Sequence, residues 1–96
     1  MKDFKKIALE NVPSIAPRNR LQWEPAQNAH VLLYPEGMIK LSDTAAEILK
    51  RIDGGATVAK IIADLEQAFP GADLRGDVLE FLNVAYERGW ISIRDR

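Results

Sequence analysis

The sequence predicts an α+β domain in which three short strands precede three helices. Between residues 20 and 41, short alternating or apolar runs are separated by turn residues, as in antiparallel strands. Between residues 42 and 88, apolar residues recur at helical spacing in three successive stretches. A chain of 96 residues is too short for two independent cores, so all of these elements are expected in one domain.

The three strands are expected at residues 20–24, 30–34 and 38–41. In the first strand, Leu21 and Trp23 alternate with polar residues, which predicts that both point to the core. The second strand is almost entirely apolar, so either both of its faces are covered or it is the central strand. Because the connections are short, the three form an antiparallel meander whose first and third strands are edges.

Each helix is expected to begin after a residue whose side chain can accept a hydrogen bond from the first turn. These capping residues are Ser42, Thr57 and Asp73. Glycine or proline follows each helix, at Gly54, Pro70 and Gly89. The apolar stripes are Ala45, Ile48, Leu49 and Ile52; Val58, Ile61, Ile62, Leu65 and Phe69; and Leu74, Val78, Phe81, Leu82 and Ala85. The order βββααα indicates a winged-helix-like domain, although a winged helix usually places its hairpin after the recognition helix.

The two ends of the chain are expected to differ in how firmly they are held on the domain. Residues 1–17 carry no sustained period and include Pro13 and Pro17, so they are predicted to form a flexible N-terminal tail or an arm that orders on a partner. The domain itself is predicted to span residues 18–96. Within it, residues 90–93 form a short extended segment that packs back on the domain.

The residue inventory argues against bond-making chemistry. The sequence contains no cysteine and one histidine, His30, so no thiolate site and no paired imidazole ligands are available for a metal. The acidic residues are spread over helix faces, and no phosphate-binding glycine loop is present. No apolar run approaches the roughly 20 residues that span a bilayer. We therefore expect a binding protein without cofactor, metal or membrane contact, in the cytoplasm.

One edge of the meander is a candidate binding surface. An exposed strand edge at residues 38–41 would offer unpaired backbone groups to an extended peptide, with Met38 as an adaptable apolar contact. The third helix would form the opposite wall through Leu79, Asn83 and Tyr86, which flank its main apolar stripe. Alternatively, these three residues pack in the core and Lys40 protects the edge.

Charge disfavours a nucleic-acid partner for the third helix. Residues 73–88 contain two arginines and four acidic residues, a net charge of −2. Such a segment repels phosphate, whereas affinity for DNA comes chiefly from Lys and Arg. The whole chain has a net charge of −1.

Several stretches, taken in order, resemble the PqqD family of pyrroloquinoline quinone biosynthesis. They are PRNR at 17–20, LQWE at 21–24, LLYPEG at 32–37, LSDTAAEIL at 41–49, and the pairs Asp77-Val78, Phe81-Leu82 and Gly89-Trp90. The resemblance covers roughly residues 13–93. It implies a non-catalytic peptide chaperone that binds the precursor peptide PqqA and presents it to the radical S-adenosylmethionine enzyme PqqE.

The resemblance also implies a binding site. In the family, the peptide adds to the third strand of the meander and lies against the third helix. The corresponding residues here are Met38, Ile39, Lys40, Leu41, Arg75, Leu79, Leu82, Asn83 and Tyr86. A recognition domain for a different ribosomally made, modified peptide is the alternative. The oligomeric state expected is a monomer or a weak homodimer.

Overall fold

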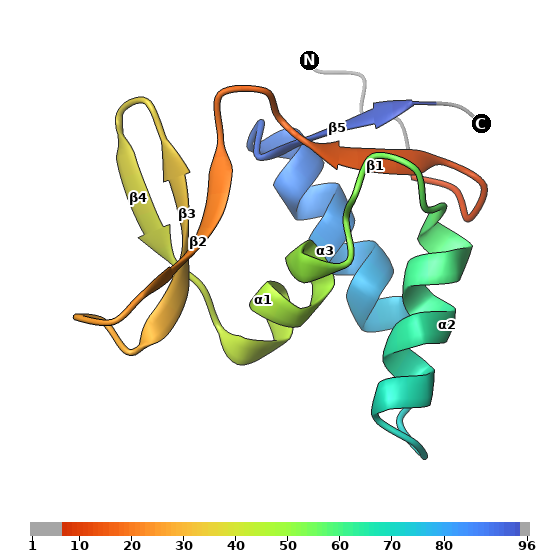
Figure 1. Ribbon diagram of the computed structural model, residues 1–96. Coiled ribbons are helices and arrows are strands. Elements are labelled where there is room, and N and C mark those ends of the chain that lie inside the picture. The colour runs from red at the N-terminus through yellow and green to blue at the C-terminus, as the bar shows by residue number, and fades with distance from the viewer. Residues whose placement is uncertain (1–6, 95–96) are drawn as a thin grey trace.

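The computed structural model describes residues 7–94 and contains five strands and three helices within them (Figure 1). The elements are β1 (Val12–Ile15), β2 (Arg20–Glu24), β3 (Ala29–Tyr34), β4 (Gly37–Lys40), α1 (Asp43–Lys50), α2 (Val58–Ala68), α3 (Arg75–Glu87) and β5 (Ile91–Arg94). The α+β class and the succession of a strand meander and three helices are confirmed. The predicted order βββααα is incomplete, because β1 precedes the meander and β5 follows the last helix.

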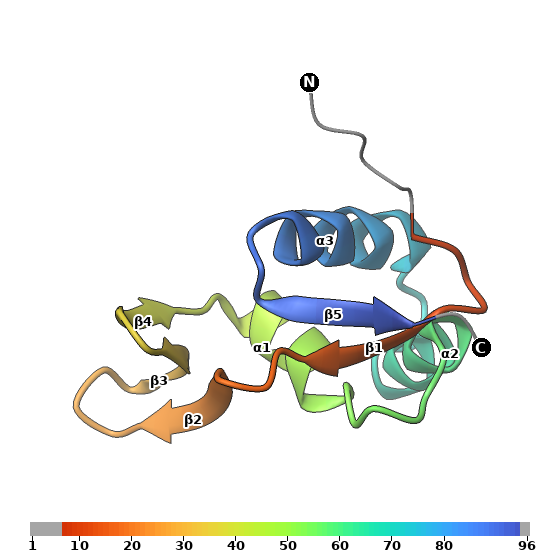
Figure 2. The same ribbon diagram turned by 90° about the horizontal axis from the view of Figure 1, so that it is seen from above.

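The strands form two separate antiparallel sheets. The meander has the order β2-β3-β4, with Leu21 opposite Leu32 and Leu32 opposite Ile39. The second sheet is a two-stranded ribbon that pairs β1 with β5, with Val12 opposite Arg94. Figure 2 shows the meander at one end of the molecule, and the ribbon running beside α3. The helices therefore contact both sheets, with α1 against β3 of the meander and α3 against β5 of the ribbon.

Two of the three predicted helix caps are confirmed. The hydroxyl of Ser42 accepts a hydrogen bond from the Ala45 N–H (3.1 Å), and the hydroxyl of Thr57 accepts one from the Lys60 N–H (3.2 Å). The prediction for the third helix is wrong, because the residue at its cap is Leu74 and not Asp73. The Leu74 N–H instead donates to the carboxylate of Glu66 on α2 (3.3 Å), so a neighbouring helix supplies the acceptor.

The core lies where the three helices meet the inner face of the meander and β5. Its fully buried members include Leu32 from β3, Ile48 from α1, Ile61 from α2 and Leu82 from α3. Burial of each such side chain contributes about 1.5–3 kcal/mol to folding. The apolar stripes of the first two helices account for half of the buried core residues, as their spacing predicts.

Residues 7–17 correct the prediction of a flexible tail, since they are built into the fold. Ile7 and Val12 are buried, and β1 is fully paired with β5. The Val58 N–H donates to the Asn11 carbonyl oxygen (2.9 Å), which ties this segment to the start of α2. The prediction for residues 1–6 lies outside the described residues.

Pro13 does not interrupt β1 because of its position in the register. The Ala16 N–H donates to the Trp90 carbonyl oxygen (3.0 Å), so the ladder bonds between β1 and β5 fall on alternate residues, including Ser14 but not Pro13. The missing N–H of Pro13 therefore faces away from β5, where a strand tolerates proline. Because Pro13 and Pro17 lie within five residues of each other, the composition of this stretch is typical of a loop, although β1 is a strand.

Two aromatic residues predicted to be buried are on the surface. Trp23 is 49% exposed and Phe69 is 45% exposed, although both continue an apolar pattern. Trp23 stands near the end of an edge strand, with its ring against His30 (ring centroids 5.1 Å apart). Phe69 follows the last helical residue of α2, where the backbone leaves the helix, so the side chain no longer follows the apolar stripe.

Candidate functional site

The outer edge of β4 presents backbone groups away from its only neighbouring strand in the meander. The Leu41 N–H donates to the His30 carbonyl oxygen (2.9 Å), and Ile39 lies opposite Leu32. Because hydrogen-bonded residues alternate along an antiparallel strand, Met38 and Lys40 direct their N–H and C=O groups outward. We call these outward backbone groups the β4 edge. In the described part of the chain, no further strand of this sheet pairs with β4.

The four site residues predicted at 38–41, of which Leu41 lies just after β4, divide into two pairs. Met38 and Lys40 are exposed, and Met38 retains 47% of its surface in solvent. Ile39 is half-buried against the core and Leu41 is buried. The side chains that are accessible to a partner are therefore those of Met38 and Lys40, whereas Ile39 and Leu41 hold the strand on the domain.

The predicted α3 residues have other neighbours than β4. Leu82 is fully buried, and Leu79 is packed against the core. The Asn83 side chain accepts a hydrogen bond from the Ile7 N–H (3.3 Å) and donates one to the Leu79 carbonyl oxygen (2.8 Å). Arg75 and Leu9 line one small cavity. Arg75, Leu79 and Asn83 thus belong to the flank of α3 beside the N-terminal segment. Tyr86 continues this flank seven residues after Leu79 and is 38% exposed.

The opposite flank of α3 lies nearer to the meander. Leu74 and Val78 line the same cavity as Trp23 and His30, which are meander residues. Phe81 lies on this flank too, with its ring 6.3 Å from that of Trp90. The apolar spacing of α3 predicts that Leu74, Val78 and Phe81 all belong to the core stripe. No feature of the sequence distinguishes the two flanks, since both carry apolar residues at helical spacing.

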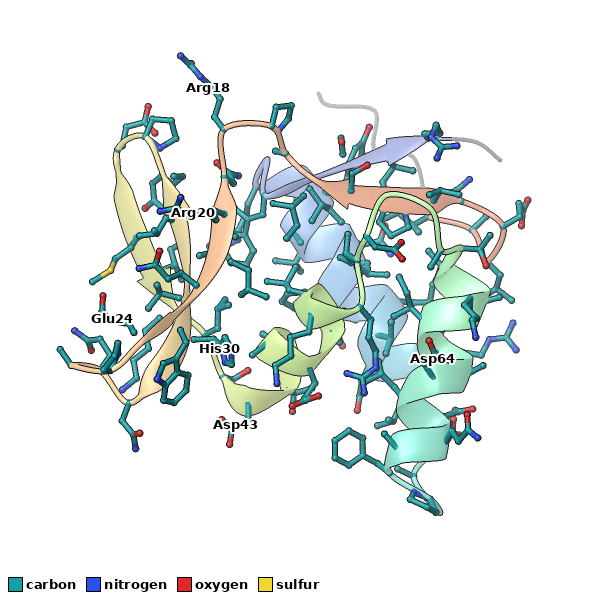
Figure 3. All side chains as sticks on the ribbon, viewed as in Figure 1. Arg18, Arg20, Glu24, His30, Asp43 and Asp64 are labelled. Carbon is teal, nitrogen blue, oxygen red and sulfur yellow. The ribbon has the colours of Figure 1, made fainter. Side chains whose placement is uncertain are left out.

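A larger surface feature, which we call the α1 groove, was not foreseen. It is an apolar hollow of about 630 Å³ that runs past α1 from the meander to the ends of α2 and α3. It is lined by Trp23, His30, Asp43, Thr44, Ala46, Glu47, Ile48, Lys50, Leu65, Phe69, Ala72, Leu74, Asp77 and Val78. Figure 3 shows His30 near the start of β3 and Asp43 at the start of α1, on the same side of the molecule.

One charged cluster borders the α1 groove. Glu47 accepts hydrogen bonds from Arg51 (2.9 Å) and Lys50 (3.0 Å). These bonds lower the pKa of the Glu47 carboxyl below its ordinary value, because they stabilise its charged form. The carboxylate is therefore ionised near neutral pH and acts as the centre of a small surface ion cluster.

Within residues 7–94, no group of three or more His, Asp or Glu side chains is arranged to hold a metal ion. No helix in the described part of the chain is both long enough and apolar enough to cross a membrane. Two surfaces of the described residues, the β4 edge and the α1 groove, are candidates for binding a partner.

Comparison with known proteins gives the family. Residues 29–91 match the family model for coenzyme PQQ synthesis protein D (PqqD). A protein of Azotobacter vinelandii named PqqA binding protein is 55% identical over 91 residues, which cover 94% of this chain and 99% of the relative. The protein of the same name from Stutzerimonas stutzeri is 53% identical over 92 residues, covering 95% and 100% of the two chains.

A solved structure has the same fold. The solution structure of the PqqD truncation of Methylobacterium extorquens PqqCD, described as a functional and stand-alone recognition element for ribosomally synthesised and post-translationally modified peptides, matches with a TM-score of 0.75. It is 31% identical, and the match covers 90% of this chain and 94% of that one. Sequence and fold therefore agree that the chain belongs to the PqqD family and is a binding protein, not an enzyme.

Proposed function

We propose that this protein binds the precursor peptide PqqA as an added strand on the β4 edge. The relatives at about half identity carry the name PqqA binding protein, and the solved relative is described as a peptide recognition element. The observation that carries the proposal is the pair of outward-facing backbone groups at Met38 and Lys40. Such an edge supplies main-chain hydrogen bonds to an extended peptide, whereas nearby side chains set its register.

The bound peptide is the substrate of a further enzyme. The carrier presents it to the radical S-adenosylmethionine enzyme PqqE, and contributes no reacting group of its own. The order of a β-meander and three helices, with α1 packed against β3, supports the winged-helix-like description of the fold. On α3, Tyr86 is proposed as a peptide contact because its side chain is accessible. A contact with Leu82 is disfavoured because that side chain is fully buried.

Removal of one outward donor tests the β4 edge. We expect Lys40→Pro to weaken binding of synthetic PqqA roughly three- to tenfold, since one main-chain hydrogen bond contributes about 0.5–1.5 kcal/mol. A proline is tolerated where the N–H faces outward from an edge strand. The matched control is Lys40→Ala, which removes the side chain and retains the N–H. Isothermal titration calorimetry gives both affinities, and circular dichroism confirms that both variants are folded.

The same titration separates the possible outcomes. Equal affinities for the proline and alanine variants would place the peptide elsewhere than on the β4 edge. Absence of PqqA binding by the unaltered protein, together with binding of a leader peptide from another modified-peptide system, would replace PqqA by a different ligand of the same class.

A further inference from the structure

The α1 groove brings together exposed aromatic side chains from distant parts of the chain. Trp23 on β2 and Phe69 after α2 retain 49% and 45% of their surface in solvent, and both line the same hollow. Single exposed apolar residues are ordinary on a protein surface. Two large aromatic rings that border one apolar hollow of about 630 Å³ instead form the kind of patch that marks an interaction site.

The lining of the groove favours a helical occupant. Most of its lining residues belong to α1, α2 and α3, whose interior N–H and C=O groups are already paired within each helix. An extended peptide would find few backbone partners there, whereas a helix satisfies its own. The eight residues of α1 give a floor about 12 Å long. This length accommodates roughly two turns of an amphipathic helix with its apolar face inward.

The charges of the groove favour a basic occupant. Its lining includes three carboxylates, those of Asp43, Glu47 and Asp77, and one ammonium group, that of Lys50. Glu47 is paired with Lys50 and Arg51. Neither Asp43 nor Asp77 forms an ion pair with another described residue. A partner with Lys or Arg beside its apolar anchors would complement these two carboxylates, and electrostatic attraction would accelerate its association.

We propose that the α1 groove docks an amphipathic helix with basic flanks that belongs to the enzyme receiving the peptide. This inference rests on the proposed function, because it identifies the partner as PqqE. No β4 residue lines the groove, so the groove and the β4 edge are two separate surfaces. The carrier holds its peptide on one surface and the enzyme on the other. Peptide and enzyme therefore do not compete for the same residues.

The experiment measures the binding of purified PqqE and of synthetic PqqA to the full chain and its variants by titration calorimetry. The test variants are Phe69→Ala, which removes an aromatic wall, and Asp77→Lys, which reverses a charge in the lining. Glu80→Lys is the matched control, since Glu80 is exposed on the same helix and does not line the groove. We expect each test variant to weaken PqqE binding tenfold or more, while PqqA affinity changes less than twofold. Glu80→Lys should bind both partners as the unaltered chain does.

Two results would overturn the proposal. One is a folded Phe69→Ala and a folded Asp77→Lys variant that both retain the full affinity for PqqE. The other is no measurable binding of PqqE to the unaltered chain. The PqqA arm tests the proposed function by itself. If PqqA does not bind but PqqE binding still depends on Phe69 and Asp77, the peptide-carrier function fails while the docking surface stands.

Discussion

Asn83 joins two segments that are far apart in the sequence. Its side chain accepts a hydrogen bond from the Ile7 N–H, a residue 76 positions away, and donates one to the Leu79 carbonyl oxygen. In the sequence, Asn83 is a polar residue on the flank of an apolar stripe, a position that predicts a contact with a peptide. The structure gives it a position beside the N-terminal segment, a pairing that no local pattern in the sequence encodes.

We expect Asn83→Ala to lower the free energy of unfolding by about 1 kcal/mol, as for a typical partly buried hydrogen bond. Urea unfolding measures the loss of stability, and NMR hydrogen exchange of the Ile7 amide locates it. Asn83→Asp is the control, because it retains an acceptor oxygen for the Ile7 N–H. Unchanged exchange of the Ile7 amide in Asn83→Ala would show that this bond does not hold the segment.

Asp53 gives the stability a dependence on pH. Its carboxylate accepts hydrogen bonds from the N–H groups of Gly55 (2.9 Å) and Ala56 (2.8 Å), in the loop between α1 and α2. These bonds lower the pKa of Asp53 below its ordinary value of 3.8. A carboxyl whose pKa is lower in the folded state stabilises the fold above its unfolded pKa. The stabilisation is lost as the pH falls through the folded pKa.

We therefore expect Asp53→Asn to lose less stability than the unaltered chain between about pH 5 and pH 2. Asparagine keeps an acceptor oxygen for the two N–H groups but does not ionise. Urea unfolding at several pH values provides the comparison. Parallel pH profiles for the two proteins would mean that the Asp53 carboxylate does not contribute to the acid sensitivity.

At the scale of single elements, the ribbon of β1 and β5 is part of the domain. Val12 on β1 is buried, as is Ile7 in the segment before it, and Ile91 on β5 is a core residue. Each buried side chain of this kind contributes about 1.5–3 kcal/mol, and a domain of this size has a total stability of about 5–15 kcal/mol. Removal of β1 would therefore take away a large part of the stability and leave β5 without its partner.

A shortened chain of residues 18–96 tests this conclusion, since it begins where the sequence predicted the domain to begin. We expect it to be unfolded, or less stable than the full chain by at least about 3 kcal/mol. Circular dichroism and urea unfolding provide the measurement. A cooperative transition at the same urea concentration as the full chain would restore the predicted boundary.

The elements that could be predicted are those with local causes. Ser42 and Thr57 cap α1 and α2, and the apolar stripes of these helices are buried where the spacing places them, apart from Phe69 at the end of α2. The start of α3 depends on Glu66 of another helix, and β1 depends on a strand almost eighty residues later. The β4 edge was predicted because a three-strand meander always leaves its outer strands open. The α1 groove was not, since it arises only where the meander and three helices meet.

For the whole molecule, charge and architecture support different expectations about DNA. Adjacent helices beside a β-meander are common in DNA-binding domains, but the chain has a net charge of −1. We expect no salt-dependent complex with duplex DNA in a gel-shift assay at protein concentrations of about 10 µM, because affinity for the phosphate backbone requires an excess of Lys and Arg. A shifted band that weakens as salt rises would contradict this expectation.

The pairing of β1 with β5 also determines where the protein can be attached to another. Val12 and Arg94 lie opposite each other in the ribbon, at the end of the molecule away from the meander (Figure 2). A second domain fused after Arg94 would therefore be tethered beside the beginning of β1, far from β4. Covalent fusion at this point leaves the strand edge open, so that genetic joining of such a domain to an enzyme is compatible with peptide capture.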